Sequence, residues 1–288
     1  MSGFFGGLDI GSATTKAAIV SEDAVLGHAV VATGVHCDET ARNLMNQVIE
    51  AHGLQFGDLK GVTTTGYGRR LVSFATGTIS EITANVRGAV WYGQQGGRQI
   101  RTIINIGGQD SKVISLDEQG VTKNFSMNDK CAAGTGRFLE SLARILEVNL
   151  TELGDIALEA EVPIRINSTC TVFAESEIIS LIARGRKKSE IVAGAHYAIA
   201  NRLARMARRV GVVDQVFFDG GPALNRGLVE AVENEIAAEL YVPPDVPQVT
   251  TAVGAALIAR DEYLYGAETD ELPKARRMNR EAECNLCP

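Results

Sequence analysis

The feature that most constrains the fold of this chain is a pattern of two strands and a turn that occurs twice. In the first copy, apolar strands expected at 8–10 and 17–20 are joined by a turn of glycine and serine. In the second copy, strands expected at 102–106 and 113–116 flank the segment Gly-Gly-Gln-Asp-Ser-Lys. A repeated unit of this kind predicts two α/β domains of similar topology that face one cleft.

Length and charge narrow the class of protein. The chain has 288 residues, and single cores stop growing at roughly 250–300 residues, so two domains are expected. The predicted limits are 1–98 for the first domain, 99–250 for the second, 251–265 for a segment that packs back onto the first, and 266–288 for a surface tail. A net charge of −7 argues against a nucleic-acid partner. The lack of a membrane-length apolar run and of a signal peptide predicts a cytoplasmic protein without membrane contact.

Hydrophobic periodicity predicts the other main elements. They are strands at 25–31 and 215–218 and helices at 39–52, 134–146, 173–184, 189–210 and 252–259. The last helix is rich in alanine and glycine, so we expect it to pack closely on its neighbours.

Three turns at strand ends carry residue types that bind phosphate. They supply glycines, hydroxyls and a lysine: Gly11, Ser12, Thr14 and Lys16 in the first, Gly107 and Gly108 in the second, and Gly220, Gly221, Pro222 and Asn225 in the third. Backbone N–H groups and a lysine together form a phosphate cradle, and a nearby carboxylate can hold Mg²⁺ through water. A plain hairpin turn explains the first segment equally well when it is taken alone. Neither a Walker motif nor a dinucleotide-binding glycine motif follows a strand.

The order of these turns resembles that in the superfamily of sugar kinases, chaperones and actin. The resemblance covers residues 8–260 and implies two actin-like (ribonuclease H-like) α/β domains around a nucleotide cleft. It further implies that the first two turns hold the phosphates of ATP from opposite domains, while the third turn binds adenosine.

Two of the five cysteines, Cys131 and Cys170, each precede an expected helix. A helix N-terminus lowers the pKa of a thiol and favours a thiolate ligand, because it carries partial positive charge. Two thiolates cannot complete a [4Fe–4S] cluster, but a two-fold dimer supplies two from each subunit. Burial of both cysteines in the core is the alternative. The tail pair Cys284 and Cys287 is interpreted as functionally silent, and Cys37 as structural.

A more specific resemblance is carried by four segments: 65–69, 80–82, 128–139 and 168–177. They are similar to segments of the ATPase family that activates 2-hydroxyacyl-CoA dehydratases and forms ATPase subunits of benzoyl-CoA reductases. The resemblance implies a homodimer, or a heterodimer with a homologous ATPase subunit, that shares one [4Fe–4S] cluster held by Cys131 and Cys170 of each subunit. It also implies ATP-driven delivery of single low-potential electrons from reduced ferredoxin or flavodoxin to an Fe–S reductase or dehydratase component that acts on a CoA thioester.

Roles in ATP hydrolysis follow as hypotheses. We expect Asp9 and Asp110 to organise Mg²⁺ and water, and Gln109 to help place the attacking water. Lys16 and the loop amides would neutralise phosphate charge, since such catalysis depends on positioning and electrostatics. The segment Gly134, Thr135 and Gly136 is also expected to contribute to cofactor binding.

The chain departs from the family pattern at three positions. Family members often have a cysteine and a histidine where this chain has Ala84 and Asn85, and an aspartate where it has Asn105. Asn105 favours one alternative function, a non-catalytic ATP-binding regulator. A second alternative is an actin-fold small-molecule kinase that binds no cluster. Between the two branches of the family, length and tail favour an ATPase subunit of a benzoyl-CoA reductase.

Overall fold

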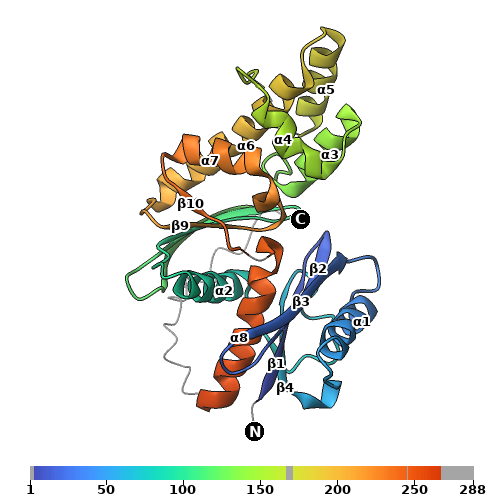
Figure 1. Cartoon of the computed structure of the whole chain (residues 1–288), viewed down its shortest axis with the longest axis vertical. Coiled ribbons are helices and arrows are strands. Elements are labelled where there is room, and N and C mark those ends of the chain that lie inside the picture. The colour runs from blue at the N-terminus through green and yellow to red at the C-terminus, as the bar shows by residue number, and fades with distance from the viewer. Residues whose placement is uncertain (1–2, 167–170, 245, 267–288) are drawn as a thin grey trace, which may run out of the picture.

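The fold contains two mixed β-sheets of five strands each (Figure 1). A computed structural model describes residues 3–166, 171–244 and 246–266 of the chain. The first sheet has the order β3-β2-β1-β4-β5 and consists of β1 (Phe4–Ile10), β2 (Thr14–Val20), β3 (Val25–Ala32), β4 (Leu59–Gly66) and β5 (Gly77–Thr78). The second has the order β10-β9-β6-β7-β8 and consists of β6 (Thr102–Ile106), β7 (Ser111–Leu116), β8 (Thr122–Asn128), β9 (Val216–Asp219) and β10 (Leu240–Tyr241).

The two sheets have the same topology. In each, three antiparallel strands are followed by two parallel ones: β3-β2-β1 continue into β4 and β5, and β8-β7-β6 continue into β9 and β10. The registers also correspond, because Asp9 pairs with Lys16 across the first hairpin and Asn105 pairs with Lys112 across the second. The predicted fold class, two actin-like α/β units, is therefore confirmed.

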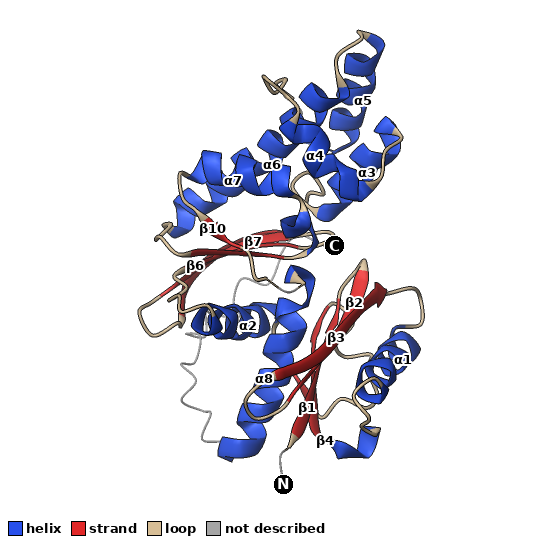
Figure 2. Ribbon diagram, viewed as in Figure 1, coloured by secondary structure: helices blue, strands red, loops and turns tan. Residues whose placement is uncertain are grey.

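Helices cover both faces of the two sheets (Figure 2). They are α1 (Cys37–Glu50), α2 (Glu81–Gln95), α3 (Gly136–Leu146), α4 (Leu153–Leu158), α5 (Thr171–Ala183), α6 (Lys188–Val210), α7 (Arg226–Ile236) and α8 (Thr250–Tyr265). Helix α1 packs on the outer face of the first sheet, and α3 to α7 lie on the far side of the second. Helices α2 and α8 form the layer between the sheets, where α8 also packs on β1, β2 and β4.

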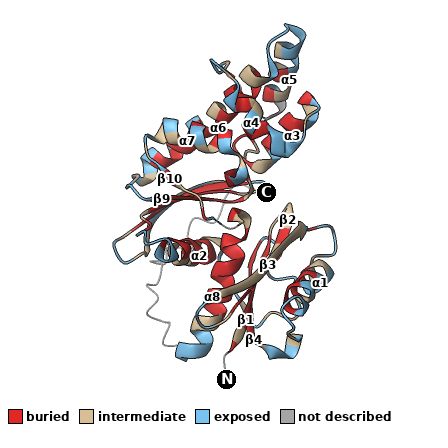
Figure 3. Cartoon of the chain, viewed as in Figure 1, coloured by how far each residue is buried: buried red, intermediate tan, exposed pale blue. Residues whose placement is uncertain are grey.

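The central strands β1, β4, β6, β7 and β9 are buried on both faces, because successive side chains point to opposite sides and helices cover both sides of each sheet (Figure 3). Leu8 and Ile10 of β1 face α1, whereas Phe5 faces the layer of α2 and α8. In that layer α2 and α8 approach each other closely at Gly88 of α2 and Gly254 of α8. A Cβ on Gly88 would lie 2.1 Å from the carbonyl oxygen of Thr250, so only glycine permits this approach.

Several elements differ from the expected ones. Helix α3 begins at Gly136 rather than Gly134, and α8 extends to Tyr265. Strands β4, β5, β8 and β10 and helices α2 and α4 were not predicted, whereas α7 is the helix expected after the third turn. Strand β8 is an edge strand with a largely polar sequence, so hydrophobic alternation does not reveal it. Most of the predicted tail, residues 267–288, lies outside the described residues, and the domain limits stay a prediction.

Candidate functional site

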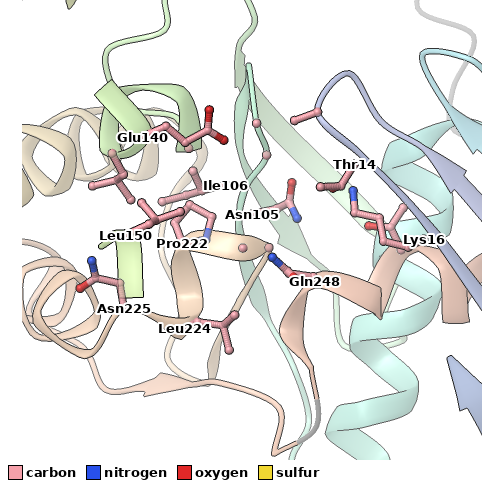
Figure 4. Close-up of a pocket in the computed structure, with 18 of the residues that line it drawn as sticks. Thr14, Lys16, Asn105, Ile106, Glu140, Leu150, Pro222, Leu224, Asn225 and Gln248 are labelled. Carbon is pink, nitrogen blue, oxygen red and sulfur yellow. The ribbon is translucent and has the colours of Figure 1, made fainter. Parts of the chain in front are cut away.

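The turns at the strand ends meet around a cavity of about 320 Å³ between the two sheets. Side chains of opposite character line its two ends (Figure 4). Thr14 and Lys16 lie at one end, Asn105 lies in the middle, and Leu150 and Leu224 lie at the other end. Leu150 and Leu224 are about half exposed, at 47% and 59%, although they are large apolar residues. The cavity therefore combines a polar end with an end where leucine side chains lie beside Glu140 and Asn225, as suits a phosphorylated ligand with a flat ring.

The first turn joins β1 to β2 and is closed by its own backbone. The N–H of Gly11 donates to the carbonyl oxygen of Thr14 at 3.1 Å, and the hydroxyl of Thr33 donates to the carbonyl oxygen of Gly11 at 2.7 Å. Lys16 Nζ lies 2.9 Å from Asp9 Oδ2. Asp9 is buried, and its Oδ1 atom has no hydrogen-bond partner among the described residues. Asp9 and Lys16 together line the polar end of the cavity.

The second turn contains a buried cation. Lys112 Nζ lies 2.7 Å from Glu81 Oε1, contacts Asp110 Oδ2, and lies 3.5 Å from Asn105 Oδ1. Burial alone would lower the pKa of Lys112, but its attraction to Glu81 and Asp110 is stronger and holds that pKa above the ordinary value. Burial raises the pKa of Glu81, and Lys112 opposes this shift. The ammonium of Lys112 thus compensates the negative charge of the two carboxylates that it contacts.

The third turn follows β9. Gly220 has a φ of +94°, and a Cβ there would lie 2.1 Å from the carbonyl oxygen of Ile106, so this turn requires glycine. Asn225 caps α7, because its Oδ1 accepts the N–H of Leu228 at 2.9 Å. Its Nδ2 lies 3.2 Å from Nε2 of His196, which is fully buried. Burial lowers the pKa of His196 to about 4, so the ring is neutral.

A further buried carboxyl group, that of Asp219, connects β9 with β6 and α2. Asp219 at the end of β9 accepts the Nδ2 of Asn105 at 2.9 Å and the Nδ2 of Asn85 at 2.6 Å. Asn85 Nδ2 also lies 3.2 Å from the hydroxyl of Thr251. Burial raises the pKa of Asp219 to about 7, against the hydrogen bonds from the two asparagines. The two unusual asparagines of the sequence therefore share one carboxylate.

The structure brings most of the predicted nucleotide residues together. Those that line the cavity are Asp9, Thr14, Lys16, Gly107, Gly108, Gly136, Gly220, Gly221, Pro222 and Asn225. Other predicted residues are not among the lining residues: Gly11, Ser12, Gln109, Asp110, Gly134 and Thr135. Gln109 is exposed at the second turn, whereas Asp110 is buried against Lys112.

Cys131 lies on the segment that links β8 to α3. It is half-buried, and its carbonyl oxygen accepts the Nδ2 of Asn128 at 2.9 Å. Four residues separate Cys131 from the first residue of α3. Cys131 therefore lies before a turn, and not directly at the helix N-terminus as predicted. Gly134 in this turn has a φ of +112° and lies against the side chain of Arg202, away from the cavity. The other predicted cluster ligand, Cys170, lies outside the described residues.

The turn after Cys131 is joined to the second nucleotide turn through the backbone. The N–H of Gly136 donates to the carbonyl oxygen of Gly107 at 2.9 Å, and the N–H of Arg137 donates to that of Gly108 at 3.0 Å. The start of α3 and the second turn therefore move as one piece.

Sequence reasoning missed several lining residues, including Glu81, Leu139, Glu140, Leu150, Thr151, Leu224, Gln248 and Thr251. Glu81 had a detectable signal. It follows Ser80, whose hydroxyl accepts the N–H of Thr83 at 3.1 Å and caps α2. A carboxylate in the first turn of a capped helix is a recognisable local pattern. The leucines carry no such signal, because only the fold exposes them to the cavity.

Comparison with known proteins identifies the family. The sequence of residues 7–259 matches the BadF/BadG/BcrA/BcrD ATPase family. The chain belongs to this family. The predicted family, and with it the assignment as an ATPase, is confirmed.

Relatives in both branches of the family are similar to this chain. The 2-hydroxyisocaproyl-CoA dehydratase activator of Clostridioides difficile is 45% identical over 260 residues, which cover 89% of this chain and 94% of the relative. A benzoyl-CoA reductase subunit of Thauera aromatica is 35% identical over 223 residues, which cover 75% of this chain and 77% of the relative.

Solved structures agree with the fold. The activator of the 2-hydroxyisocaproyl-CoA dehydratase from Clostridium difficile, with bound ADPNP, has a TM-score of 0.84 and 42% identity and covers 94% of this chain and 97% of that one. A ROK family glucokinase from Streptomyces griseus, in complex with glucose and AMPPNP, has a TM-score of 0.54 and 13% identity over 90% of this chain and 100% of that one, which shows the fold alone. Within the described part of the chain, no helix has the length and apolar character needed to cross a membrane.

Proposed function

We propose that the protein is an ATP-hydrolysing activator that transfers single low-potential electrons to a 2-hydroxyacyl-CoA dehydratase. In this proposal a [4Fe–4S] cluster, held by Cys131 and Cys170 of two subunits, receives electrons from reduced ferredoxin or flavodoxin. The cluster, when bound, supplies one-electron chemistry at low potential. The partly exposed position of Cys131, on a turn at the molecular surface, fits a ligand that must meet its counterpart from a second subunit.

One observation carries the proposal: two backbone hydrogen bonds connect the second turn with the start of α3. Gly136 and Arg137 donate to Gly107 and Gly108, which line the cavity. A change in the contacts between phosphate and Gly107 or Gly108 is therefore transmitted directly to the segment that follows Cys131. This is the physical link that an ATP-driven electron carrier requires.

The cavity fits ATP at both ends. Lys16 and the N–H groups of the first two turns would surround the phosphates, and the apolar surfaces of Leu150 and Leu224 would enclose the adenine. The third turn, with Gly220, Gly221, Pro222 and Asn225, would hold the adenosine. Gly108 supports close approach of the two phosphate turns, because a Cβ there would lie 2.8 Å from the Cβ of Ala13.

For Mg²⁺ the donor set permits indirect binding. Among the described residues, no group of three or more His, Cys, Asp or Glu side chains is arranged to enclose a metal ion. Asp9, which lines the polar end of the cavity, would hold the ion through a bound water, because Mg²⁺ keeps several waters and binds nucleotide phosphates directly. Asp110 would act on the site indirectly, through its ion pair with Lys112. Gln109 would help place the attacking water.

The activator branch is better supported than the reductase branch. The match extends over 94% of the dehydratase activator at 45% identity, against 77% of the reductase subunit at 35%. This comparison outweighs the length and the tail, which favoured a reductase subunit in the sequence analysis.

The test is iron and acid-labile sulfide in protein purified without oxygen. We expect about four of each per dimer, lost in Cys131→Ala and in Cys170→Ala. Cys37→Ala is the matched control, because Cys37 lies at the start of α1 on the opposite sheet and should leave the iron content unchanged. A wild type that is free of iron and hydrolyses ATP only with a small acceptor would contradict the proposal and indicate a kinase.

A second measurement separates the activator from a regulator. Reduced, ATP-loaded protein is mixed with a 2-hydroxyacyl-CoA dehydratase, and dehydration is followed with and without ATP. Activity that requires hydrolysable ATP supports the proposal, whereas nucleotide binding without turnover, alone and with the partner, would support the regulator.

A further inference from the structure

The two halves of the chain place their carboxylates differently at equivalent positions. In the first sheet, Asp9 on β1 pairs with Lys16 across the hairpin and with Thr65 on the parallel neighbour β4. In the second sheet, Asn105 on β6 pairs with Lys112 and with Asp219 on the parallel neighbour β9. The carboxyl group that neighbours this strand position therefore lies on the parallel strand β9 in the second half, not on the hairpin strand as in the first.

The position of that charge fixes the orientation of the Asn105 amide. Its Nδ2 donates to Asp219 at 2.9 Å, and its Oδ1 lies 3.5 Å from the ammonium of Lys112. Rotating the amide by half a turn would place Oδ1 against the carboxylate and Nδ2 against the ammonium. Both contacts would then be repulsive in a buried site, where electrostatic interactions are strong.

Asn105 and Asp219 have different access to the nucleotide cavity. Asn105 lines the cavity, while Asp219 is 1% exposed and is not among the lining residues. Asp219 is further held by Asn85 of α2, at 2.6 Å, so it joins two strands to the layer between the sheets. Among the lining residues, Asn105 is hydrogen-bonded to Asp219 directly, whereas Thr251 is reached only through Asn85.

We propose that Asp219 is a positioning residue for ATP hydrolysis, which holds the amide of Asn105 so that its Oδ1 faces the nucleotide cavity as a hydrogen-bond acceptor. This oxygen would accept a hydrogen bond from a water beside the terminal phosphate and so orient that water. Asn105 then performs, as a neutral oxygen, the task that a carboxylate performs at the matching position Asp9. This inference rests on the proposed ATP hydrolysis and adds to it the residue pair that orders the water.

A double-mutant cycle tests whether Asp219 acts through Asn105. The variants are Asp219→Thr, Asn105→Ala and the two combined, with Asp23→Thr in an exposed loop as the matched control. We expect Asp219→Thr to lower kcat about 10- to 100-fold, the usual loss when a supporting hydrogen-bond partner is removed, with KM for ATP within about threefold. In the Asn105→Ala background the same change should leave kcat within about twofold. An equal loss in both backgrounds, or no loss in either, would overturn the proposal.

A rescue variant keeps the test decisive if the single variants fold poorly. Asn105→Asp with Asp219→Thr recreates in the second sheet the pairing of Asp9 with Thr65, and it always presents an oxygen to the cavity. We expect kcat within about threefold of wild type, with the melting temperature measured alongside. A well-folded double variant with the low kcat of Asp219→Thr would contradict the proposal. Wild-type protein without any ATP turnover would instead contradict the proposed function itself, so the two failures are distinguishable.

Discussion

Lys16 and Lys112 occupy matching positions in the two hairpins, yet their surroundings differ. Lys16 lines the cavity, and its side chain is 15% exposed beside a single carboxylate. Lys112 is 1% exposed and lies between Glu81 and Asp110, with its ammonium 3.5 Å from Asn105 Oδ1. The same hairpin thus provides a lysine that lines the cavity in one sheet and a buried, structural lysine in the other. The difference shows that a repeated motif need not repeat its chemistry.

The largest expected effect is the loss of stability on replacing Lys112, which tests whether the two lysines differ in structural role. Lys112→Met leaves Glu81 and Asp110 buried without their cation, so we expect the free energy of unfolding to fall by about 3–5 kcal/mol. Denaturant unfolding measures the loss. Lys16→Met is the comparison and should cost less than Lys112→Met, since it leaves one buried carboxylate, that of Asp9, without its cation rather than two. Equal losses in the two variants would show that the two lysines have the same structural role.

A buried neutral group in the third turn provides a contrast with the buried charge of Lys112. The pKa of His196 is lowered from 6.5 to about 4 in the folded state. Above pH 6.5 the ring is neutral in both states, and as the pH falls towards 4 only the unfolded state gains the proton. Stability should therefore fall by up to about 3 kcal/mol over this range, at about 1.4 kcal/mol per unit of pKa.

The measurement for His196 is the free energy of unfolding between pH 7 and 4, in wild type and in His196→Gln. The glutamine keeps an oxygen for Asn225 but does not titrate, so its pH dependence should be flatter by that amount. Parallel curves for the two proteins would show that His196 titrates normally in the folded state.

A third prediction tests the ligand-binding role of Lys16. Lys16→Met should lower kcat/KM for ATP hydrolysis about 100-fold, equal to about 2.7 kcal/mol, because one positive donor is lost where phosphate charge develops. Steady-state kinetics with a melting curve measure it. Lys123→Met on the exposed face of β8 is the matched control and should retain full activity. A normal kcat/KM for Lys16→Met would place the phosphates elsewhere.

The smallest expected effect is the loss of stability on removing the cap of α2, the helix that holds Glu81 near Lys112. Ser80→Ala removes the cap of α2 and should lower the free energy of unfolding by about 1 kcal/mol. Ser80→Thr keeps the hydroxyl and should recover most of this loss. If Ser80→Ala and Ser80→Thr are equally stable, the hydroxyl does not contribute to the start of the helix.

The residue types within each turn made the turns predictable, whereas contacts between residues distant in the sequence could not be predicted. Glycines and a carboxylate at a strand end carry their signal within a few residues, so the loops around Gly11, Gly107 and Gly220 were placed correctly in the fold. The burial of Lys112 could not be predicted, because lysine is normally exposed. Asn85 and Asn105 were recognised as unusual residues. Their common partner, Asp219, lies more than a hundred positions away along the chain, and only the folded structure reveals it.

The connection between the second turn and α3 is made by main-chain atoms only. Each bond joins a backbone N–H at Gly136 or Arg137 to a backbone carbonyl at Gly107 or Gly108. Almost any side chain could therefore change around it without removing either bond; only proline, which lacks the N–H, would do so directly. Mutational drift can thus alter the nucleotide preference or the partner surface of such a protein while the path between its two ends persists.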